Sequence, residues 1–382
     1  MTTTRNFLPD QYQQTGRYPV NHNYLQQQFA DYEAIFEEMR RVVRDGDFTL
    51  GKAVNEFEDR FARLVGVKYA VGVGSGTDAL FLSLKALGIG AGDEVITTPY
   101  TFFATVGAIV TAGARPVFVD IGNDYNIDPT LIERAVTGRT KAILPVHWSG
   151  NPCRMPEIVA VSRKHGLRVI EDACHAIQAT RDGVPAGSFG DAGCFSMHPL
   201  KNLNVWGDGG VVATNSSTLY ESLVLLRNHG LVNRSECRVF GYNSRLDTLQ
   251  AVVALHLMRK LDDITAARIR NAAYFDRRLA EIDEITVPPR DPSAKQVYHL
   301  YIVRCQRRDE LQRFLCANGV DAKVHYPIPM HLQPAAVSLG YREGDFPMCE
   351  AIVKSVLSLP VHEYITPAQQ DHVVSLVKQF YS

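Results

Sequence analysis

One lysine of this 382-residue chain has a setting that is unusual for a solvent-exposed charge. Lys201 is the only lysine between Lys164 and Lys260, and it lies in Cys194–Gly210 (CFSMHPLKNLNVWGDGG), between a proline-containing turn and a glycine cluster. A lone lysine is most often solvated. A lysine that forms a Schiff base instead needs a fixed position, partial burial and neighbours that keep its amine available. The role of Lys201 therefore depends on the motifs that accompany it.

A second segment has the composition of an anion-binding loop. In Val71–Leu80 (VGVGSGTDAL), a predicted strand ends in alternating glycines, and Thr77 opens a predicted helix. Small residues let backbone N–H groups approach an anion, and a helix N-terminus adds positive potential. The pattern favours a phosphate site over a plain tight turn. No lysine follows the last glycine, which excludes a Walker loop, and Asp93 and Glu94 start a strand, which weakens a dinucleotide-binding interpretation.

A third segment supplies carboxylates at the end of a strand. Val169–His175 (VIEDACH) places Glu171 and Asp172 at the carboxyl end of an apolar run, where open α/β sheets bind ligands. Asp172 can either cap the following helix or hold a proton on a heterocycle nitrogen. A phosphate loop, a strand-end aspartate and a lysine about 30 residues further on occur in the order of a pyridoxal-phosphate site. In that interpretation Asp172 pairs with the pyridinium nitrogen and Lys201 forms the imine.

Further motifs extend this interpretation to nearly the whole chain. In order they are Gly74–Leu80 (GSGTDAL), Pro99–Thr105 (PYTFFAT), Glu171–His175 (EDACH), Ser196–Lys201 (SMHPLK) with Gly207–Gly210 (GDGG), Arg227–Gly230 (RNHG), Gly241–Arg245 (GYNSR) with Leu249 and Gln250, and Tyr326–His331 (YPIPMH). With these motifs the chain resembles the sugar aminotransferases of the DegT/DnrJ/EryC1/StrS family. The resemblance implies the α/β fold of aspartate aminotransferase, fold type I of the pyridoxal-phosphate enzymes. It comprises a large, mainly parallel seven-stranded sheet domain and a smaller carboxyl-terminal α+β domain.

The resemblance implies roles for four residues around the cofactor ring. Asp172 keeps the ring nitrogen protonated, and the ring of Phe102 lies against the pyridine face, a position that suits a flat aromatic side chain. Lys201 binds the cofactor and then moves a proton as general base and acid. His175 lies beside the ring or one layer further out, and its interpretation as an ordinary core histidine stays equally open.

The phosphate group has its own predicted contacts. By resemblance Gly76, Thr77 and the Ser196 hydroxyl hold the phosphate of pyridoxal 5'-phosphate. Asn243 matches a position that reaches across a dimer interface to the partner's phosphate in this family. The resemblance therefore implies a homodimer with active sites at the interface.

Two residues are expected near the sugar. His331 lies in the loop that the family places there. Trp206 and Asp208 depart from the usual family pattern after the lysine, so Trp206 is expected to alter the substrate pocket. The Trp-containing loop is similar to that of the aminotransferase which forms 8-amino-3,8-dideoxy-octulosonate for lipopolysaccharide.

The implied activity is transfer of an amino group from glutamate to a keto or aldehyde carbon of a sugar or sugar acid. Such amino sugars serve cell-surface polysaccharide, lipopolysaccharide or secondary metabolites. Two alternatives stay open: a dehydratase or cysteine-dependent lyase of the same fold, and a regulatory relative without catalysis. The dehydratase branch has His in place of the lysine. Here His198 lies three residues before that position and Lys201 is present, which disfavours this branch.

The elements that must position these residues follow an alternating pattern of strands and helices, which predicts a mainly parallel sheet. Strand-like runs are predicted at 69–73, 94–98, 116–120, 141–146, 167–171, 193–197 and 210–214. The link between the last two is too short for a crossover, so these two strands are predicted to be antiparallel. The predicted organisation is a lead-in at 1–30, a large cofactor-binding domain at 31–255 and a small domain at 256–382.

Composition narrows the class of protein. The net charge of −1 offers no long-range attraction for nucleic acid or an anionic membrane. No stretch approaches the roughly 20 apolar residues of a membrane span. The seven cysteines are an odd number without a CxxC pair, which favours reduced thiols in a cytoplasmic protein over disulfides or a metal site.

Overall fold

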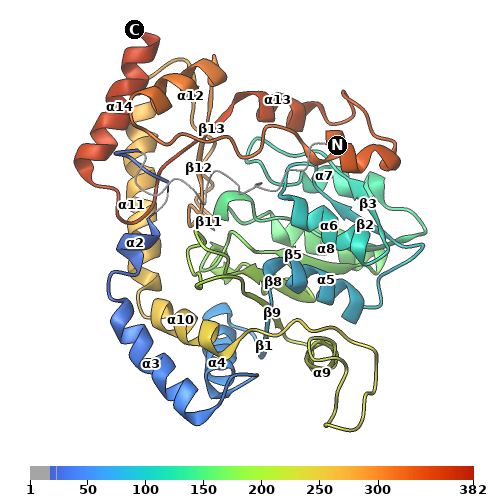
Figure 1. The fold of residues 1–382 in the computed structure, drawn as a ribbon. Helices are drawn as coiled ribbons and strands as arrows, with labels where there is room; N and C mark the ends of the chain where they lie inside the picture. Colours follow the sequence, from blue (N-terminus) through green and yellow to red (C-terminus); the bar gives the residue numbers. More distant parts are fainter. Residues whose placement is uncertain (1–17, 23) are drawn as a thin grey trace, which may run out of the picture.

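The computed structural model describes residues 18–22 and 24–382, so much of the predicted lead-in at 1–30 lies outside the described residues. A seven-stranded sheet forms the centre of the molecule (Figure 1), in the order β1-β9-β8-β5-β4-β2-β3. Its strands are β1 Tyr69–Val73, β2 Glu94–Thr97, β3 Arg115–Phe118, β4 Thr140–Ile143, β5 Arg168–Asp172, β8 Ala192–Ser196 and β9 Gly210–Thr214. Each of the seven predicted strand runs therefore contributes one strand.

Only β9 runs against its neighbours. It pairs antiparallel with β1 and with β8, whereas β8, β5, β4, β2 and β3 pair in parallel. The predicted antiparallel pair and the mainly parallel sheet are thus confirmed. Because β1, β2, β5 and β8 run in one direction, their carboxyl ends meet at the same edge of the sheet, which is where ligands bind in such folds.

Helices cover both faces of this sheet, which explains the continuous apolar composition of the strands. Val212 of β9 packs in one apolar cluster with α5, α6 and α9, while Val211 and Ala213 face the opposite cluster with α4 and α10. The covering helices are α3 Tyr32–Asp45, α4 Lys52–Val65, α5 Gly76–Ala86, α6 Phe103–Thr111, α7 Pro129–Ile132, α8 Met155–His165, α9 Ser217–Leu226 and α10 Thr248–Met258.

A second, smaller unit is built on the three-stranded sheet β10-β12-β13. Helices α11, α12 and α14 pack in one apolar cluster with it, and α13 in another. The elements are α11 Leu261–Leu279, β10 Ile285–Thr286, β12 Tyr301–Cys305, α12 Arg308–Ala317, α13 Pro347–Ser355, β13 Val356–Leu359 and α14 Pro367–Tyr381. A short third sheet joins β6 Thr180–Arg181, β7 Val184–Pro185 and β11 Ala294–Lys295. The predicted domain boundary at 255/256 falls inside α10 and stays a prediction.

The amino-terminal segment contacts both units. Val20 packs in the apolar cluster of the smaller unit and pairs with Val320. The short helix α2 Leu25–Gln28 follows, and α3 then packs along α10 (Figure 1). Among the described residues, no helix combines the length and the apolar character that crossing a bilayer requires.

Gly210 provides a test of how tightly the sheet edge is packed. A Cβ at Gly210 would lie 2.1 Å from the carbonyl oxygen of Ser75, so Gly210→Ala must push β9 away from the turn between β1 and α5. We expect it to lower the free energy of unfolding in urea by about 1–3 kcal/mol. The control Gly107→Ala adds a methyl group to open space in α6 and should raise that free energy by about 0.5–1 kcal/mol. Equal effects of the two changes would contradict this packing argument.

Candidate active site

A cavity of about 260 Å³ lies where the carboxyl ends of β1, β5 and β8 meet the smaller unit. The structure brings together seven of the predicted site residues in its lining: Gly76, Thr77, Phe102, Asp172, His175, Ser196 and Lys201. The smaller unit adds Arg268, His299, His325 and Tyr326, to which the sequence analysis assigned no role. The other three predicted site residues, Asn243, Trp206 and His331, lie outside this lining.

One end of the cavity is the N-terminus of α5. Ser75 caps this helix, since its hydroxyl oxygen accepts a hydrogen bond from the backbone N–H of Asp78 at 3.0 Å. A Cβ on Gly76 would lie 2.6 Å from Cβ of Ser196, so only glycine allows the helix and the end of β8 to approach this closely. Backbone N–H groups with hydroxyl groups beside them are a suitable donor set for a phosphate. These residues therefore fit the phosphate of a cofactor.

Asp172 is fixed at the end of β5 with its carboxylate oriented. It is 5% exposed. Its Oδ2 accepts a hydrogen bond from the Thr105 hydroxyl at 2.7 Å, and its Oδ1 accepts one from the backbone N–H of Cys174 at 3.2 Å. An oriented carboxylate of this kind can accept a charge-assisted hydrogen bond from a protonated ring nitrogen. Thr105 was missed by the sequence analysis, although it ends the PYTFFAT motif.

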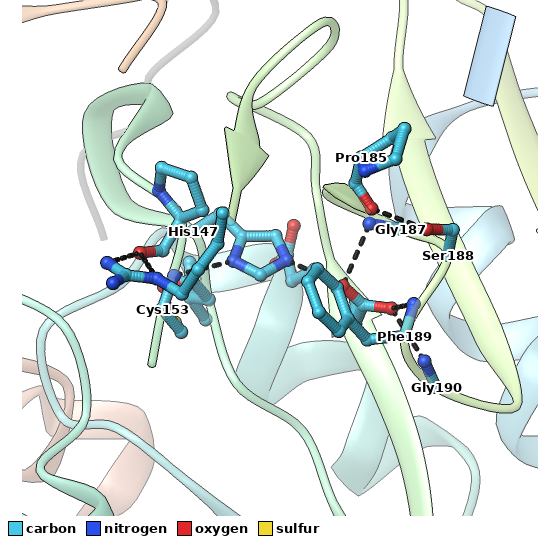
Figure 2. Close-up of polar contacts among 12 residues, drawn as sticks. His147, Cys153, Pro185, Gly187, Ser188, Phe189 and Gly190 are labelled. Atoms are coloured by element: carbon cyan, nitrogen blue, oxygen red, sulfur yellow. Dashed lines mark hydrogen bonds and ion pairs between the residues drawn. The ribbon is translucent and has the colours of Figure 1, made fainter. Parts of the chain in front are cut away.

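The neighbouring Glu171 anchors the end of the same strand. This buried carboxylate accepts hydrogen bonds at 2.8 Å from the three backbone N–H groups of residues 187, 189 and 190, and one at 2.9 Å from Nε2 of His147. The N–H of Cys153 donates to Nδ1 of His147, so Nε2 is the protonated nitrogen. Figure 2 shows His147 between Cys153 and the loop at 187–190. The resulting clamp holds the main chain directly beside Asp172.

Lys201 lies in the cavity wall without an ion-pair partner among the described residues. Burial lowers the pKa of its amine from 10.5 to about 8, while Cys174 and Asp172 act in the opposite direction. A substantial part of the amine is therefore unprotonated under mildly alkaline conditions. An unprotonated lysine amine is the form that attacks a carbonyl carbon.

Three buried histidines with lowered pKa values also line the cavity. The rings of His175 and His299 lie 4.3 Å apart, and burial lowers the pKa of both well below the usual histidine range. Burial also lowers the pKa of His325 to about 3. His175, left open between a site residue and a core residue, thus lines the cavity while it also packs on Trp148. Only the spatial arrangement reveals His299 and His325, because no motif assigned to the cofactor contains them.

Trp206 does not reach the cavity, contrary to the expectation that it shapes the substrate pocket. Its ring packs edge-on against Phe29 and Phe36, with 5.5 Å between ring centroids in both pairs. Its backbone N–H and carbonyl are both held by the Gln250 side chain, at 2.9 and 2.8 Å. The indole therefore buries apolar surface against the amino-terminal helices, and Asp208 is the departing residue that lines the cavity.

His331 and Asn243 also lie away from the cavity. His331 is 2% exposed, its Nε2 lies 3.0 Å from Oε1 of Glu350, and it packs on Phe346, so its contacts within the chain are those of a core residue. His331 therefore does not line the cavity. Asn243 is exposed on the loop that follows α9.

The comparison with known protein families agrees with these features. Residues 30–378 match the DegT/DnrJ/EryC1/StrS aminotransferase family. The chain belongs to this family. A relative from Geobacillus stearothermophilus, named a pleiotropic regulatory protein, is 43% identical over 92% of this chain and 96% of its own length. A Streptomyces venezuelae relative, named dTDP-3-amino-3,4,6-trideoxy-alpha-D-glucose transaminase, is 39% identical over 92% of this chain and 95% of its own.

Solved structures of relatives share the fold. DesV from S. venezuelae, in complex with a ketimine intermediate, has a TM-score of 0.93 at 38% identity, over 95% of this chain and 98% of its own. NtdA from Bacillus subtilis, with bound cofactor PMP, has a TM-score of 0.86 at 31% identity, over 92% of this chain and 82% of its own. The predicted family and the predicted type I fold are therefore confirmed, as is the prediction of a sugar aminotransferase dependent on pyridoxal phosphate.

The low pKa of Lys201 leads to a direct test on the cofactor-free protein. Because burial disfavours the charged amine, Lys201 should lose its proton as the pH rises through about 8. Acetylation rates, measured by peptide mass mapping from pH 6 to 11, should show a midpoint near 8 for Lys201. The exposed Lys141 serves as the internal reference for reagent decay. A midpoint near the ordinary lysine value of about 10.4 would contradict the burial of this amine.

Proposed function

We propose that this sugar aminotransferase moves an amino group from glutamate to the keto or aldehyde carbon of a sugar or sugar acid. The observation that carries the proposal is the meeting of three groups in one cavity: the N-terminus of α5, the oriented carboxylate of Asp172 and the low-pKa amine of Lys201. When bound, pyridoxal phosphate supplies an aldehyde for the lysine and a ring that withdraws electrons from the reacting carbon. Glutamate as the donor is inferred from the family resemblance.

Different residues of the cavity have different roles in this proposal. The first backbone N–H groups of α5, with the hydroxyls of Thr77 and Ser196, hold the phosphate group. Asp172, whose carboxylate Thr105 orients, accepts the hydrogen bond of the ring N–H and so keeps that nitrogen protonated. The Lys201 amine would act first as general base toward the substrate carbon and then as general acid, a task that needs a group with a pKa near the working pH.

We further propose that two copies of the chain form the active unit. Support comes from the loop after α9, where Asn243 is exposed next to apolar side chains that also lack cover. Phe240 is 99% exposed, and Val239 and Tyr242 are exposed as well. Clustered exposed apolar side chains are typical of interaction surfaces. A second copy seated on this loop would bury them and bring Asn243 to the partner's phosphate site.

The proposed substrate class is a keto or aldehyde sugar or sugar acid. A product such as 8-amino-3,8-dideoxy-octulosonate, and a role in lipopolysaccharide synthesis, are narrower proposals that rest on the departing run at 204–208. Within this run Asp208 lines the cavity and Trp206 packs elsewhere, so Asp208 is the candidate for contact with the sugar. Reduced cysteines support a cytoplasmic location as a further proposal.

A regulatory role is the second candidate, because a relative at 43% identity bears a regulatory name. The dehydratase alternative has less support, since Lys201 and not a histidine occupies the lysine position in the cavity. The two remaining candidates differ in turnover: an aminotransferase forms 2-oxoglutarate from glutamate when a keto sugar is present, and a protein that only senses the cofactor does not.

Borohydride trapping tests the assignment of Lys201. The protein with pyridoxal phosphate should show a visible or near-ultraviolet band that borohydride abolishes, and peptide mapping should find the reduced cofactor on Lys201. Lys201→Ala should lack this band and lose amino transfer by about 10²–10⁴-fold or more, since it removes both the attachment point and the acid–base group. Lys141→Ala, at an exposed lysine, is the matched control. Absence of cofactor uptake by the unaltered protein would refute the proposal, and uptake without transfer to any keto sugar would favour the regulatory role.

Asn243→Ala tests the interface. If Asn243 contacts the partner's phosphate site, its loss should weaken pyridoxal-phosphate binding about tenfold or more, as expected for a hydrogen bond to a charged group. Equilibrium dialysis measures the affinity, and light scattering checks that the dimer persists. Asn318→Ala, an exposed asparagine after α12, is the control. An unchanged affinity in an intact dimer would show that Asn243 makes no such contact.

A further inference from the structure

A set of buried polar contacts joins the loop that carries Lys201 to the amino-terminal segment. The hydroxyl of Tyr24 donates a hydrogen bond to the carbonyl oxygen of Leu200 at 3.0 Å. The side-chain amide of Asn204 donates to the carbonyl oxygen of Lys201 at 2.8 Å and to Oε1 of Gln28 at 2.7 Å. The backbone carbonyl groups of the consecutive residues Leu200 and Lys201 therefore both accept hydrogen bonds from side chains. Tyr24 donates to the first and Asn204 to the second.

Further contacts extend from Gln28 into the smaller unit and lead back to Tyr24. Nε2 of Gln28 donates to Oε1 of Glu363 at 3.1 Å, and the other oxygen of Glu363 lies 3.2 Å from Nη2 of Arg268. The guanidinium of Arg268 lies over the ring of Tyr24, 5.0 Å from its centroid. The result is a closed network through α2, the lysine loop, α11 and the segment after β13.

Burial makes this network sensitive to the loss of any member. Tyr24 is 3% exposed, Gln28 and Arg268 are 1% exposed, and Asn204 is fully buried. A buried polar group that loses its partner keeps the cost of its desolvation, because water cannot replace the bond. The orientation of each group in the network is therefore strongly determined by the others.

The backbone at Leu200 needs such support. Leu200 has a φ of +79°, in the left-handed region that side chains with a Cβ avoid. A residue in this region persists only where its surroundings impose the conformation. The bond from Tyr24 ends on the carbonyl of this residue, directly before Lys201.

We propose that Tyr24, Gln28 and Asn204 are positioning residues for Lys201. They fix the main chain around a lysine whose long side chain is otherwise flexible, so that its amine lies at one place in the cavity wall. The catalytic meaning of this position rests on the proposed function, but the position itself is a property of the chain. In this view the amino-terminal segment is a working part of the active site as well as a link between the two units.

Tyr24→Phe is the sharpest test because it removes one oxygen atom and keeps the ring. Gln28→Met removes the amide at similar length. In each purified variant we expect kcat with glutamate and a keto sugar to fall about three- to tenfold, with KM for glutamate changed less than twofold, as a neutral hydrogen bond predicts. In the cofactor-free variants the acetylation midpoint of Lys201 should move upward from about 8, because a displaced amine regains solvent.

Tyr125→Phe is the matched control. The hydroxyl of Tyr125 is also buried, has no hydrogen-bond partner among the described residues and lies outside the cavity lining. This variant should leave kcat and the Lys201 midpoint unchanged. The double variant of Tyr24 and Gln28 should lose less than the product of the two single effects, because both act through one network.

A merely structural role would give a different result. If Tyr24→Phe and Gln28→Met lower the melting temperature but match Tyr125→Phe in kcat and in the Lys201 midpoint, the positioning role is refuted. Should Gln28→Met fail to fold, Tyr24→Phe decides alone. The acetylation midpoint needs no cofactor, so it tests the positioning even if the unaltered protein shows no amino transfer and the proposed function fails.

Discussion

The site depends on a close approach of backbones at the edge of the large sheet. Gly210 of β9 lies opposite Val73 at the end of β1 and opposite Ser196 at the end of β8, so one residue without a side chain sits between the two strand ends. A Cβ there would collide with the carbonyl of Ser75, and a Cβ on Gly76 would collide with Ser196. This glycine contact brings the α5 N-terminus and the lysine loop together, although they are far apart in sequence.

Ionisable side chains surround this glycine contact, and hydrogen bonding and burial determine their orientation and their pKa values. Asp172 and Glu171 lie side by side at the end of β5, and both accept hydrogen bonds that hold buried carboxylates in place. Burial lowers the pKa of Lys201 to about 8 and the pKa of His175 and His299 well below the usual histidine range, so the histidines are neutral and the lysine amine loses its proton under mildly alkaline conditions. Such a set of groups suits a reaction that moves protons at a carbon atom under mild conditions.

The run at 204–208 shows how one short loop serves three purposes. Asn204 connects the lysine backbone to Gln28, Trp206 packs against the amino-terminal helices, and Asp208 lines the cavity. The departures from the family pattern are therefore divided between packing and the site. Because its ring packs against Phe29 and Phe36, Trp206 does not line the cavity although it belongs to the same loop as Lys201.

The sequence by itself determined the family, the seven strands of the main sheet and seven of the residues that line the cavity. Local patterns carry this information: apolar runs that are buried on both faces, glycines that admit an anion, and motifs in a constant order.

Only the tertiary structure decided which side chains share the cavity. His299, His325 and Arg268 come from the smaller unit and Tyr24 from the amino terminus, and no spacing in the sequence encodes their distance from Lys201. His331 and Trp206 were assigned from motif position alone, but a hydrogen-bonding partner for one and an aromatic cluster for the other direct them away from the cavity. Contacts between segments far apart in sequence arise from packing of the whole chain, and local composition cannot specify them.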